Sequence, residues 1–245
     1  MASIAALWAH SDRERLARWL PDALVLVPIG ATEQHGPHLP TGTDALIAGE
    51  VTWRAAQQAA GRSTRPLLVT PTLELGASDH HLAFGGTLSL KPATLLAVLA
   101  DVLGSIATQG GRRAVLVNGH GGNVGVCHAA AADAAVSLGI AVGHLDYWRL
   151  AGREDGVFVP GHAGEFETSL MQVLLPAGVG TPPPRSAAPA LVAVDDVDVH
   201  TTALWASIDG YTDLPEKADE AAGQRRLDHV VEQMAKRFLD LAEAL

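Results

Sequence analysis

Four short and almost uninterrupted apolar runs most constrain how this chain folds. Runs of this kind, without the polar alternation of a half-exposed strand, are typical of strands that a parallel sheet buries on both faces. The runs occupy residues 23–29, 66–70, 114–117 and 140–145. Helical patterns separate them at about 44–60, 91–109 and 123–138. This alternation predicts a layered α/β fold with right-handed crossover connections.

The two ends of the chain are also predicted to be helical. The segment SDRERLARWL (11–20) indicates a first helix capped by Ser11 or Asp12. The residues before it lack the basic start of a signal peptide, so they are not interpreted as one. Apolar residues at three- and four-residue spacings predict a closing helix over 215–245. The Pro- and Ala-rich stretch 176–199 is expected to be irregular. With no linker and no repeat, residues 1–245 are predicted to form a single domain.

Charge and composition exclude several classes of protein. The 245 residues include 17 Lys and Arg against 27 Asp and Glu, a formal net charge of −10. The chain therefore lacks the basic footprint of a nucleic-acid or anionic-membrane binder, and no stretch reads as a membrane span. One cysteine, Cys127, excludes an internal disulfide, so we expect a protein of the reducing cytoplasm. The 11 histidines stand out, because histidine is the commonest metal ligand and a proton carrier near neutral pH.

The segment GATEQHGPHLPTGTD (30–44) gathers three potential metal ligands directly after the first apolar run. Ligand sites in open α/β sheets lie beyond the carboxyl ends of strands, so the placement suits a site. Glu33 and His35 stand two residues apart, which puts both side chains on one side of an extended chain. Asp44 follows at the start of the next predicted helix. The alternative is that Asp44 only caps that helix and His35 is an ordinary loop residue.

A glycine-rich segment, VNGHGGN (117–123), follows the third apolar run and precedes a helix. Glycines let a backbone approach a ligand closely, and amides at a helix start can stabilise developing negative charge. His120 would face the same rim as Glu33 if the two strands are neighbours. A tight turn with a surface histidine is the alternative. The candidate oxyanion donors are the amides of Gly121, Gly122 and Asn123.

The segment GHAGEFETSL (161–170) places a histidine and two carboxylates before an apolar helix. Glu165 and Glu167 are two residues apart, so on a helix they cannot both face one site, and one is expected to point inward. Acidic residues at a helix start are also favoured by the helix dipole alone. The presence of His162 makes a site the better interpretation.

Two further segments are candidates for the same site. The loop GASDHHLAFGGT (76–87) contains His80 and His81, of which at most one is expected to enter the site, because neighbours on a strand face opposite ways. Trp148 follows the fourth apolar run, and Phe158 comes further on. Such aromatic side chains either wall a small-molecule pocket or pack in the core.

The donor set of Glu, His and Asp, without cysteine, suits zinc, manganese or iron rather than a structural thiolate site. Asp44 has two carboxylate oxygens, so it could bridge two ions that hold a water or hydroxide between them. The sequence therefore indicates a metal centre that activates water.

At these residues the sequence resembles the creatininase family of metal-dependent amidohydrolases. The resemblance rests on PIGATEQHGPHLPTGTD, HLAFGGT, VNGHGGN and HAGEFETSLM, in this order between about residues 22 and 176. It implies a three-layer α/β/α domain with a mostly parallel central sheet, commonly assembled into homo-oligomers such as hexamers. It also implies two divalent ions, with Glu33, His35, Asp44 and His120 as ligands and Asp44 bridging.

The chain departs from creatininase itself at several matched positions. Creatininase has a glutamate ligand where this chain has Gly122, so a carboxylate must come from elsewhere. Glu167 is the first candidate and Glu165 the second. Creatininase also has a bulkier residue at Gly121 and a tryptophan near Phe158. The HGGN form belongs to the broader family, which includes formamide hydrolases of flavin-type biosynthesis and the peptidase of mycofactocin maturation.

The resemblance implies a hydrolase of carbon–nitrogen bonds other than peptide bonds, which cleaves a non-protein or cyclic amide with a metal-activated water, like creatinine amidohydrolase. His162 would carry a proton to the departing nitrogen. Two alternatives stay open: a peptidase or formamide hydrolase in the maturation of a peptide-derived or flavin-type cofactor, and a metal-binding protein without catalysis. The substrate is expected to be a small-molecule or peptide amide. The residues expected to contact it are Ser78, Gly121, Gly122, Trp148 and Phe158.

Overall fold

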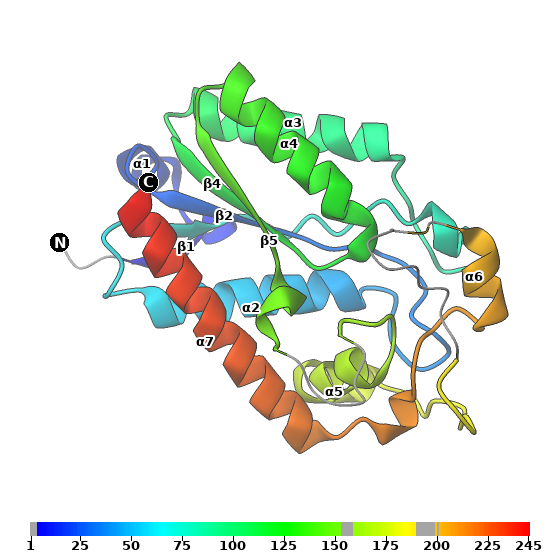
Figure 1. Ribbon diagram of the computed structural model, residues 1–245. Helices are drawn as coiled ribbons and strands as arrows, with labels where there is room; N and C mark the ends of the chain where they lie inside the picture. The colour runs from blue at the N-terminus through cyan, green and yellow to red at the C-terminus, as the bar shows by residue number, and fades with distance from the viewer. Residues whose placement is uncertain (1–3, 153–158, 190–198, 200) are drawn as a thin grey trace.

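A parallel sheet forms the centre of the fold. The computed structural model describes residues 4–152, 159–189, 199 and 201–245, and within them five strands pair in parallel in the order β1-β3-β2-β4-β5 (Figure 1). All four apolar runs form strands, as predicted. The sequence pattern does not predict β1, because three half-buried residues at a sheet edge are too few to show a period. The strands are β1 (Ala5–Leu7), β2 (Leu24–Ile29), β3 (Leu67–Val69), β4 (Arg113–Asn118) and β5 (Ala141–Asp146).

Helices cover both faces of this sheet (Figure 1). Alternate strand residues point to opposite faces, so Leu24 and Leu26 join one core whereas Val25 and Val27 join the other. The prediction of a three-layer α/β/α architecture is confirmed. The first core includes α2 (Thr43–Ala59), α5 (Glu165–Leu174) and α7 (Glu220–Ala244), and the second includes α1 (Arg13–Trp19), α3 (Pro92–Thr108) and α4 (Val124–Ser137).

Aspartate caps set where α1 and α7 begin. Asp12, one of the two predicted caps, accepts a hydrogen bond from the Arg15 amide at 2.9 Å and so starts α1. The closing helix begins at Glu220 rather than at 215, because Asp219 caps it and Pro215–Lys217 forms a separate 3₁₀ turn. The sequence pattern does not predict α6 (Thr202–Ser207), since six residues are too few to show the helical period.

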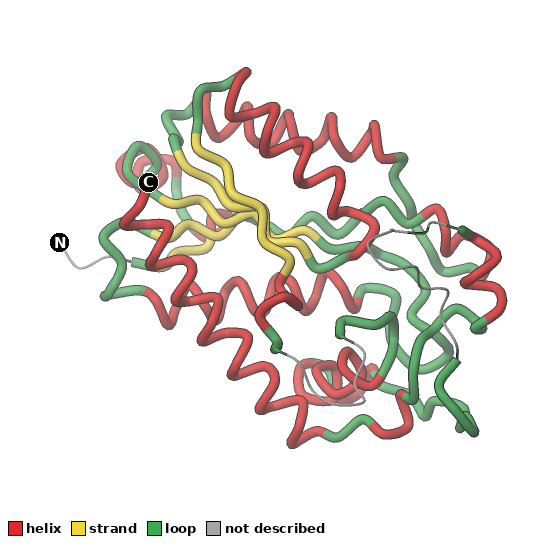
Figure 2. Tube along the Cα trace, viewed as in Figure 1, coloured by secondary structure: helices red, strands yellow, loops and turns green. Residues whose placement is uncertain are grey.

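The carboxyl ends of β2 and β4 are where a ligand site can form. The chain leaves β2 toward β3 on one side and leaves β4 toward β5 on the other, so the connections diverge between these two neighbouring strands. Such a switch point leaves a crevice beyond the strand ends. Ile29 pairs with Asn118, which places the two segments that follow them side by side. Figure 2 shows loops gathered beyond this edge of the sheet.

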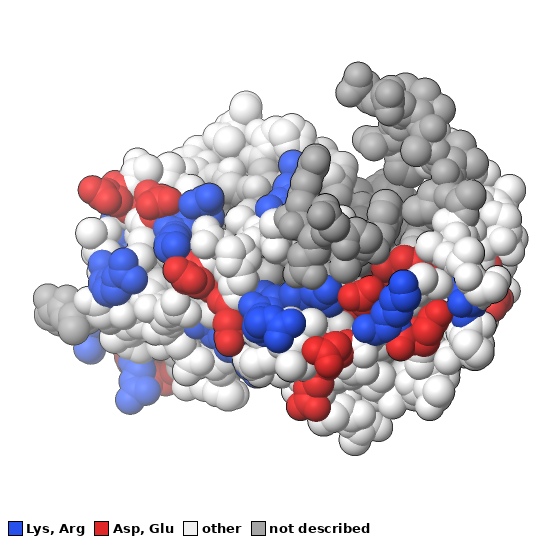
Figure 3. All heavy atoms as spheres, turned by 60° about the horizontal axis from the view of Figure 1, so that its bottom comes forward, with Lys and Arg blue, Asp and Glu red and all other residues white. Residues whose placement is uncertain are grey.

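The charged side chains give no sign of a nucleic-acid surface on the face shown in Figure 3. Acidic and basic residues are interspersed there rather than gathered into a basic patch. This pattern agrees with the net charge of −10. Among the described helices, none combines the length and apolar character that crossing a bilayer requires.

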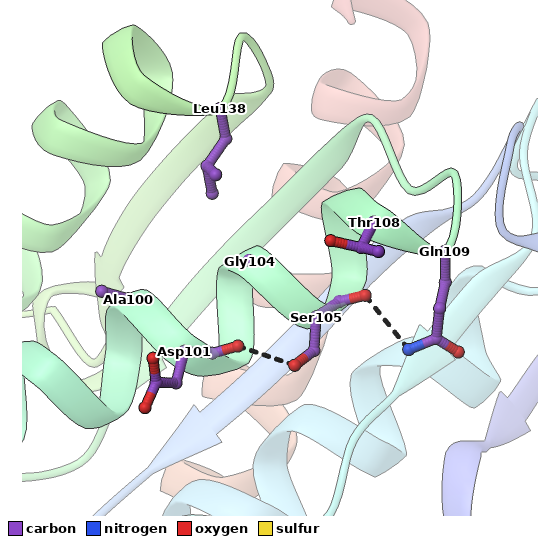
Figure 4. Close-up of a pocket in the computed structure, with 7 residues that line it drawn as sticks. All are labelled: Ala100, Asp101, Gly104, Ser105, Thr108, Gln109 and Leu138. Carbon is purple, nitrogen blue, oxygen red and sulfur yellow. Dashed lines mark hydrogen bonds between the residues drawn. The ribbon is translucent and has the colours of Figure 1, made fainter.

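A groove of about 480 Å³ lies along α3 beside Leu138 (Figure 4). Two of its polar side chains bond within the helix, since Ser105 donates to the Asp101 carbonyl and Gln109 donates to the Ser105 carbonyl. Its lining holds no histidine. The groove therefore does not offer the chemistry that the sequence motifs indicate.

Candidate metal centre

Seven buried polar side chains converge beyond the ends of β2 and β4. Each has a relative exposure of 6% or less. They come from the β2–α2 loop and the first turn of α2, from the 3₁₀ helix η2 (Asp79–Phe84), from the segment just after β4, and from the loop before α5 and the first turn of α5. The seven residues are Glu33, His35, Asp44, His81, His120, His162 and Glu167.

The Asp44 carboxylate lies between two imidazoles. Its Oδ1 is 3.1 Å from His35 Nε2, and its Oδ2 is 3.1 Å from His120 Nδ1. Glu33 Oε1 lies 3.3 Å from His120 Nδ1, and Glu167 Oε2 lies 3.9 Å from His35 Nε2. The alternative interpretation of Asp44 as a helix cap is wrong, because the N-cap of α2 is Gly42 and no side chain caps this helix.

Backbone carbonyls fix the tautomers of the two imidazoles. His35 Nδ1 lies 3.0 Å from the Glu33 carbonyl oxygen and donates to it, which leaves a lone pair on Nε2. His120 Nε2 lies 3.2 Å from the Ala77 carbonyl oxygen and donates to it, which leaves a lone pair on Nδ1. Once each ring has lost its second proton, as metal binding requires, both lone pairs face carboxylates. Imidazoles that bind metals are oriented in this way by a hydrogen bond at the other ring nitrogen.

Several oxygens in the cluster lack a hydrogen-bond partner within the described part of the chain. Both oxygens of Glu33 and Oδ2 of Asp44 are buried without a donor. A buried carboxylate without donors is costly unless a cation balances it. The orphaned oxygens and the inward lone pairs of His35 and His120 therefore fit divalent metal ions.

The ionisable groups shift one another's pKa values. Burial alone would lower the pKa of His35, but the carboxylates of Asp44, Glu167 and Glu33, with Asp44 contributing most, together outweigh it and raise that pKa to about 10. Burial would raise the pKa values of Asp44 and Glu33, yet the neighbouring imidazoles hold both below their usual range. Burial raises the pKa of Glu167 to about 8. The cluster thus gathers carboxylates that need positive charge, which protons or a divalent ion can supply.

The two glutamates of α5 point in different directions, as their spacing predicts. Glu167 is 3% exposed, and its Oε2 accepts a hydrogen bond from the Ala163 amide at 2.6 Å while facing His35. Glu165 turns away and pairs with Arg226 of α7 at 3.1 Å. Only the first is placed to join the cluster.

His162 lies against the Glu33 carboxylate. Its Nδ1 is 3.3 Å from Glu33 Oε1, and its Nε2 is 2.8 Å from the Gln34 carbonyl oxygen. Burial holds the pKa of His162 well below its usual range, so the ring is neutral. Its backbone is fixed by Thr212, whose hydroxyl accepts from the His162 amide at 2.9 Å.

Both histidines of the 76–87 loop contact the cluster, so the expectation that at most one enters is wrong. His81 Nε2 is 3.6 Å from Glu33 Oε1, and the His80 ring stacks on the His120 ring at 5.7 Å. The expectation assumed a strand, in which neighbours face opposite ways. These residues form the 3₁₀ helix η2, in which neighbouring side chains diverge far less.

Of the residues expected to contact substrate, two are exposed at the rim and others are buried with their polar groups already bonded. Gly121 and Gly122 are exposed at the rim. Ser78 is wholly buried with its hydroxyl 3.2 Å from His120 Nε2, so it supports the histidine instead of facing a substrate. The Asn123 amide donates to the His120 carbonyl, which removes it as an oxyanion donor.

The two predicted aromatic wall residues do not define a pocket. Trp148 packs against the core and against Tyr147, with ring centroids 5.6 Å apart, so the core-packing alternative describes it. Phe158 lies outside the described residues.

Three described residues that contact the site are not among the predicted site residues. The Trp205 ring lies 4.5 Å from His81 and 5.3 Å from His162, yet it belongs to the short helix α6. Gln34 contacts both of these histidines, because its side-chain amide lies 2.8 Å from His81 Nδ1 and its carbonyl accepts from His162 Nε2 at 2.8 Å; its position inside the first motif is a signal that could have revealed it. Asn118 orients His120, accepting from its amide at 3.0 Å.

A buried cluster of carboxylates and histidines at the switch point of a parallel sheet defines a candidate metallohydrolase. The family model for creatininase, described as creatinine amidohydrolase, matches residues 12–238. The chain therefore belongs to the creatininase family, and the resemblance carried by its motifs is confirmed.

The mycofactocin precursor peptide peptidase of Mycolicibacterium smegmatis is 40% identical over 165 residues, or 64% of this chain and 60% of that relative. This chain thus spans about three fifths of that relative's length. The creatinine amidohydrolase of Pseudomonas putida is 36% identical over 104 residues, or 40% of this chain and 38% of that relative. A solved mutant creatininase complexed with creatine is similar with a TM-score of 0.81 at 28% identity, over 96% of this chain and 97% of that one. Two other solved creatininases are described as a manganese form and a Zn–Zn type.

Proposed function

We propose that the protein hydrolyses amide carbon–nitrogen bonds at a centre of two divalent metal ions. The observation that carries the proposal is the Asp44 carboxylate, whose oxygens lie 3.1 Å from His35 Nε2 on one side and 3.1 Å from His120 Nδ1 on the other. Glu33 adds an oxygen beside His120, and Glu167 adds one beside His35. The ligand set around His35 and the ligand set around His120 each offer two carboxylate oxygens and one imidazole nitrogen. Such a set suits zinc, manganese or iron.

The proposed chemistry divides between the ions and the protein. When bound, two such ions lower the pKa of a water molecule and polarise an amide carbonyl, so hydrolysis proceeds near neutral pH. His162 presents the Nδ1 lone pair toward Glu33, because its Nε2 proton is held by the Gln34 carbonyl. It therefore accepts the proton released by the attacking water and delivers it to the nitrogen as the carbon–nitrogen bond breaks.

An amide within a short peptide is the better supported substrate class. The match to the peptidase extends over 165 residues, against 104 for the creatinine amidohydrolase. The open rim supports the same choice, because a Cβ at Gly121 would have no atom within 4 Å, which leaves room for a substrate that continues outward. A cyclic amide of the creatinine type is the second candidate, which the TM-score of 0.81 to creatininase favours.

Metal content and turnover together test the proposal. Elemental analysis of the purified protein should find about two ions per chain. Protein loaded with zinc, manganese or iron should then release an amine from short peptides, with creatinine and formamides as the competing substrates. Asp44→Ala should lose metal and activity together. Full turnover by metal-free Asp44→Ala protein would refute the proposal.

One variant separates catalysis from metal binding alone. His162→Ala removes the proposed proton carrier but none of the proposed ligands, so it should keep both ions and lose turnover. If the wild-type protein holds two ions and hydrolyses none of the amides, it is a metal-binding protein without this catalysis.

A further inference from the structure

We infer that His81 is a further catalytic residue, a neutral imidazole that donates its Nε2 proton to the carbonyl oxygen of the substrate amide. The inference rests on the proposed function for its substrate. The hydrogen-bond network around Gln34 fixes where the protons lie.

Two backbone groups fix the orientation of the Gln34 side-chain amide. Its Oε1 accepts from the Gly36 amide at 2.9 Å, and its Nε2 donates to the Gly210 carbonyl at 2.7 Å. Exchanging the oxygen and the nitrogen would set two acceptors against each other at Gly210 and two donors at Gly36. The amide therefore has one orientation. Its other Nε2 hydrogen faces His81 Nδ1 at 2.8 Å and His162 Nε2 at 3.0 Å. His162 Nε2 carries the proton that it donates to the Gln34 carbonyl at 2.8 Å, so it cannot accept a second one and His81 Nδ1 is the acceptor.

The ring proton of His81 is consequently on Nε2. A ring nitrogen that accepts a hydrogen bond carries no proton, and a neutral imidazole has only one. His81 is fully buried, and its Nε2 has no hydrogen-bond partner among the described residues. Its nearest carboxylate oxygen, Glu33 Oε1, is 3.6 Å away. A buried donor without an acceptor is costly, and a ligand oxygen would supply the missing acceptor.

This proton position distinguishes His81 from the three other histidines around the centre. His35, His120 and His162 each donate a ring proton to a backbone carbonyl and turn a lone pair toward the carboxylates. That arrangement suits a metal ligand or a base. His81 has the opposite arrangement, because Gln34 occupies its lone pair and the ring proton points toward the carboxylates. The Nε2–H group can donate to an oxygen atom of a ligand but cannot bind a metal ion.

The His81 ring is held in this orientation by its neighbours. It stacks on the His162 ring with centroids 4.2 Å apart and planes 15° apart, and the Trp205 ring meets it edge-on at 4.5 Å. Its proton is therefore aimed before substrate arrives. As the attacking oxygen bonds to the amide carbon, the electron pair of the C=O π bond moves onto the carbonyl oxygen. The His81 proton stabilises that negative charge and stays on the ring.

The experiment compares zinc-loaded wild-type protein with His81→Ala and His81→Gln. Three quantities are measured: zinc per chain, kcat and KM on the amide that the wild type hydrolyses, and the ¹⁵N-histidine NMR signals that report which ring nitrogen is protonated. His128→Ala, which removes an exposed histidine of α4, is the matched control and should leave all three unchanged. His81→Ala should keep its zinc and lose about 10²- to 10³-fold in kcat, with little change in KM. His81→Gln should recover part of the loss, because its amide restores an N–H donor.

Three results would overturn the inference. Loss of zinc from His81→Ala would make His81 a ligand or a support for Glu33, and an Nδ1 proton in the wild type would contradict the Gln34 argument. An unchanged kcat in His81→Ala would exclude a role for its proton. If zinc-loaded wild type hydrolyses no amide, the proposed function fails by itself. The NMR signals then still decide whether the His81 proton is on Nε2.

Discussion

Replacing Gly122 by alanine is the sharpest test of the geometry around the centre. A Cβ at this position would lie 2.2 Å from the Ala77 carbonyl oxygen and 2.5 Å from His120 Nε2, whereas ordinary contacts begin at 3.4 Å. The backbone oxygen would therefore have to retreat by about 1.2 Å, and the imidazole by about 0.9 Å, in a close-packed interior. The same collision predicts that Gly122→Glu cannot supply the glutamate that creatininase has at this position.

The magnitude follows from what that movement disturbs. The Ala77 amide donates to Asn123 at 2.9 Å, and the Ala77 carbonyl accepts from His120 at 3.2 Å. Each hydrogen bond contributes about 1 kcal/mol, and overpacking costs about 1–3 kcal/mol. We expect Gly122→Ala to lower the free energy of unfolding by about 3 kcal/mol, or Tm by roughly 6–12 °C at this chain length. Zinc affinity should also fall by about tenfold or more, because His120 shifts.

Urea unfolding and competition with a zinc chelator measure both effects. Gly121→Ala is the matched control, because a Cβ there meets no atom within 4 Å. It should stay within about 0.5 kcal/mol of the wild type. The reasoning is refuted if Gly122→Ala matches Gly121→Ala in stability and in zinc affinity.

Three further predictions concern the ligands and their supports. Glu167→Gln should reduce the metal content from two ions to one, whereas Glu165→Gln should keep both; equal contents by elemental analysis would contradict the assignment. Asn118→Ala removes the acceptor of the buried His120 amide, so the free energy of unfolding should fall by about 1–3 kcal/mol and metal affinity by about tenfold. Unchanged metal affinity in a chelator competition would contradict this role of Asn118. The neighbouring carboxylates, with Asp44 contributing most, raise the pKa of His35 to about 10, so an incoming ion must displace a proton at pH 7 and affinity should rise with pH up to that value. Calorimetry in buffers of different ionisation enthalpy detects the released proton, and pH-independent affinity would exclude the mechanism.

The sequence predicts the fold well where burial is complete on both faces. The continuous apolar runs of β2 and β4 are stable only where both faces of the strand are buried. Their side chains accordingly divide between the two cores. The edge strand β1 and the helix α6 escape prediction, because three and six residues carry too little periodicity. The start of α7 is misplaced because Asp219, rather than the apolar pattern, decides where the helix begins.

The site is predictable where it depends on strand ends and less so where it depends on loop packing. Glu33, His35 and His120 follow directly from segments after β2 and β4, whose pairing brings them together. The environment of Ser78 depends on how the residue before η2 packs against His120, beyond the end of β4, which no local pattern reveals. Trp205 reaches the histidines from a segment whose sequence carries no motif.

The contacts of Gln34 have a consequence for the order in which the molecule folds. All five described strands are complete by Asp146, but Gln34 bonds His162 through its carbonyl and Gly210 through its side chain, at sequence separations of 128 and 176 residues. Contacts between such distant segments form slowly, because a long loop must close first. We therefore expect sheet formation to precede completion of the centre, so metal capture during refolding should follow the burial of the strands, which stopped-flow refolding with a metal-sensitive dye would measure.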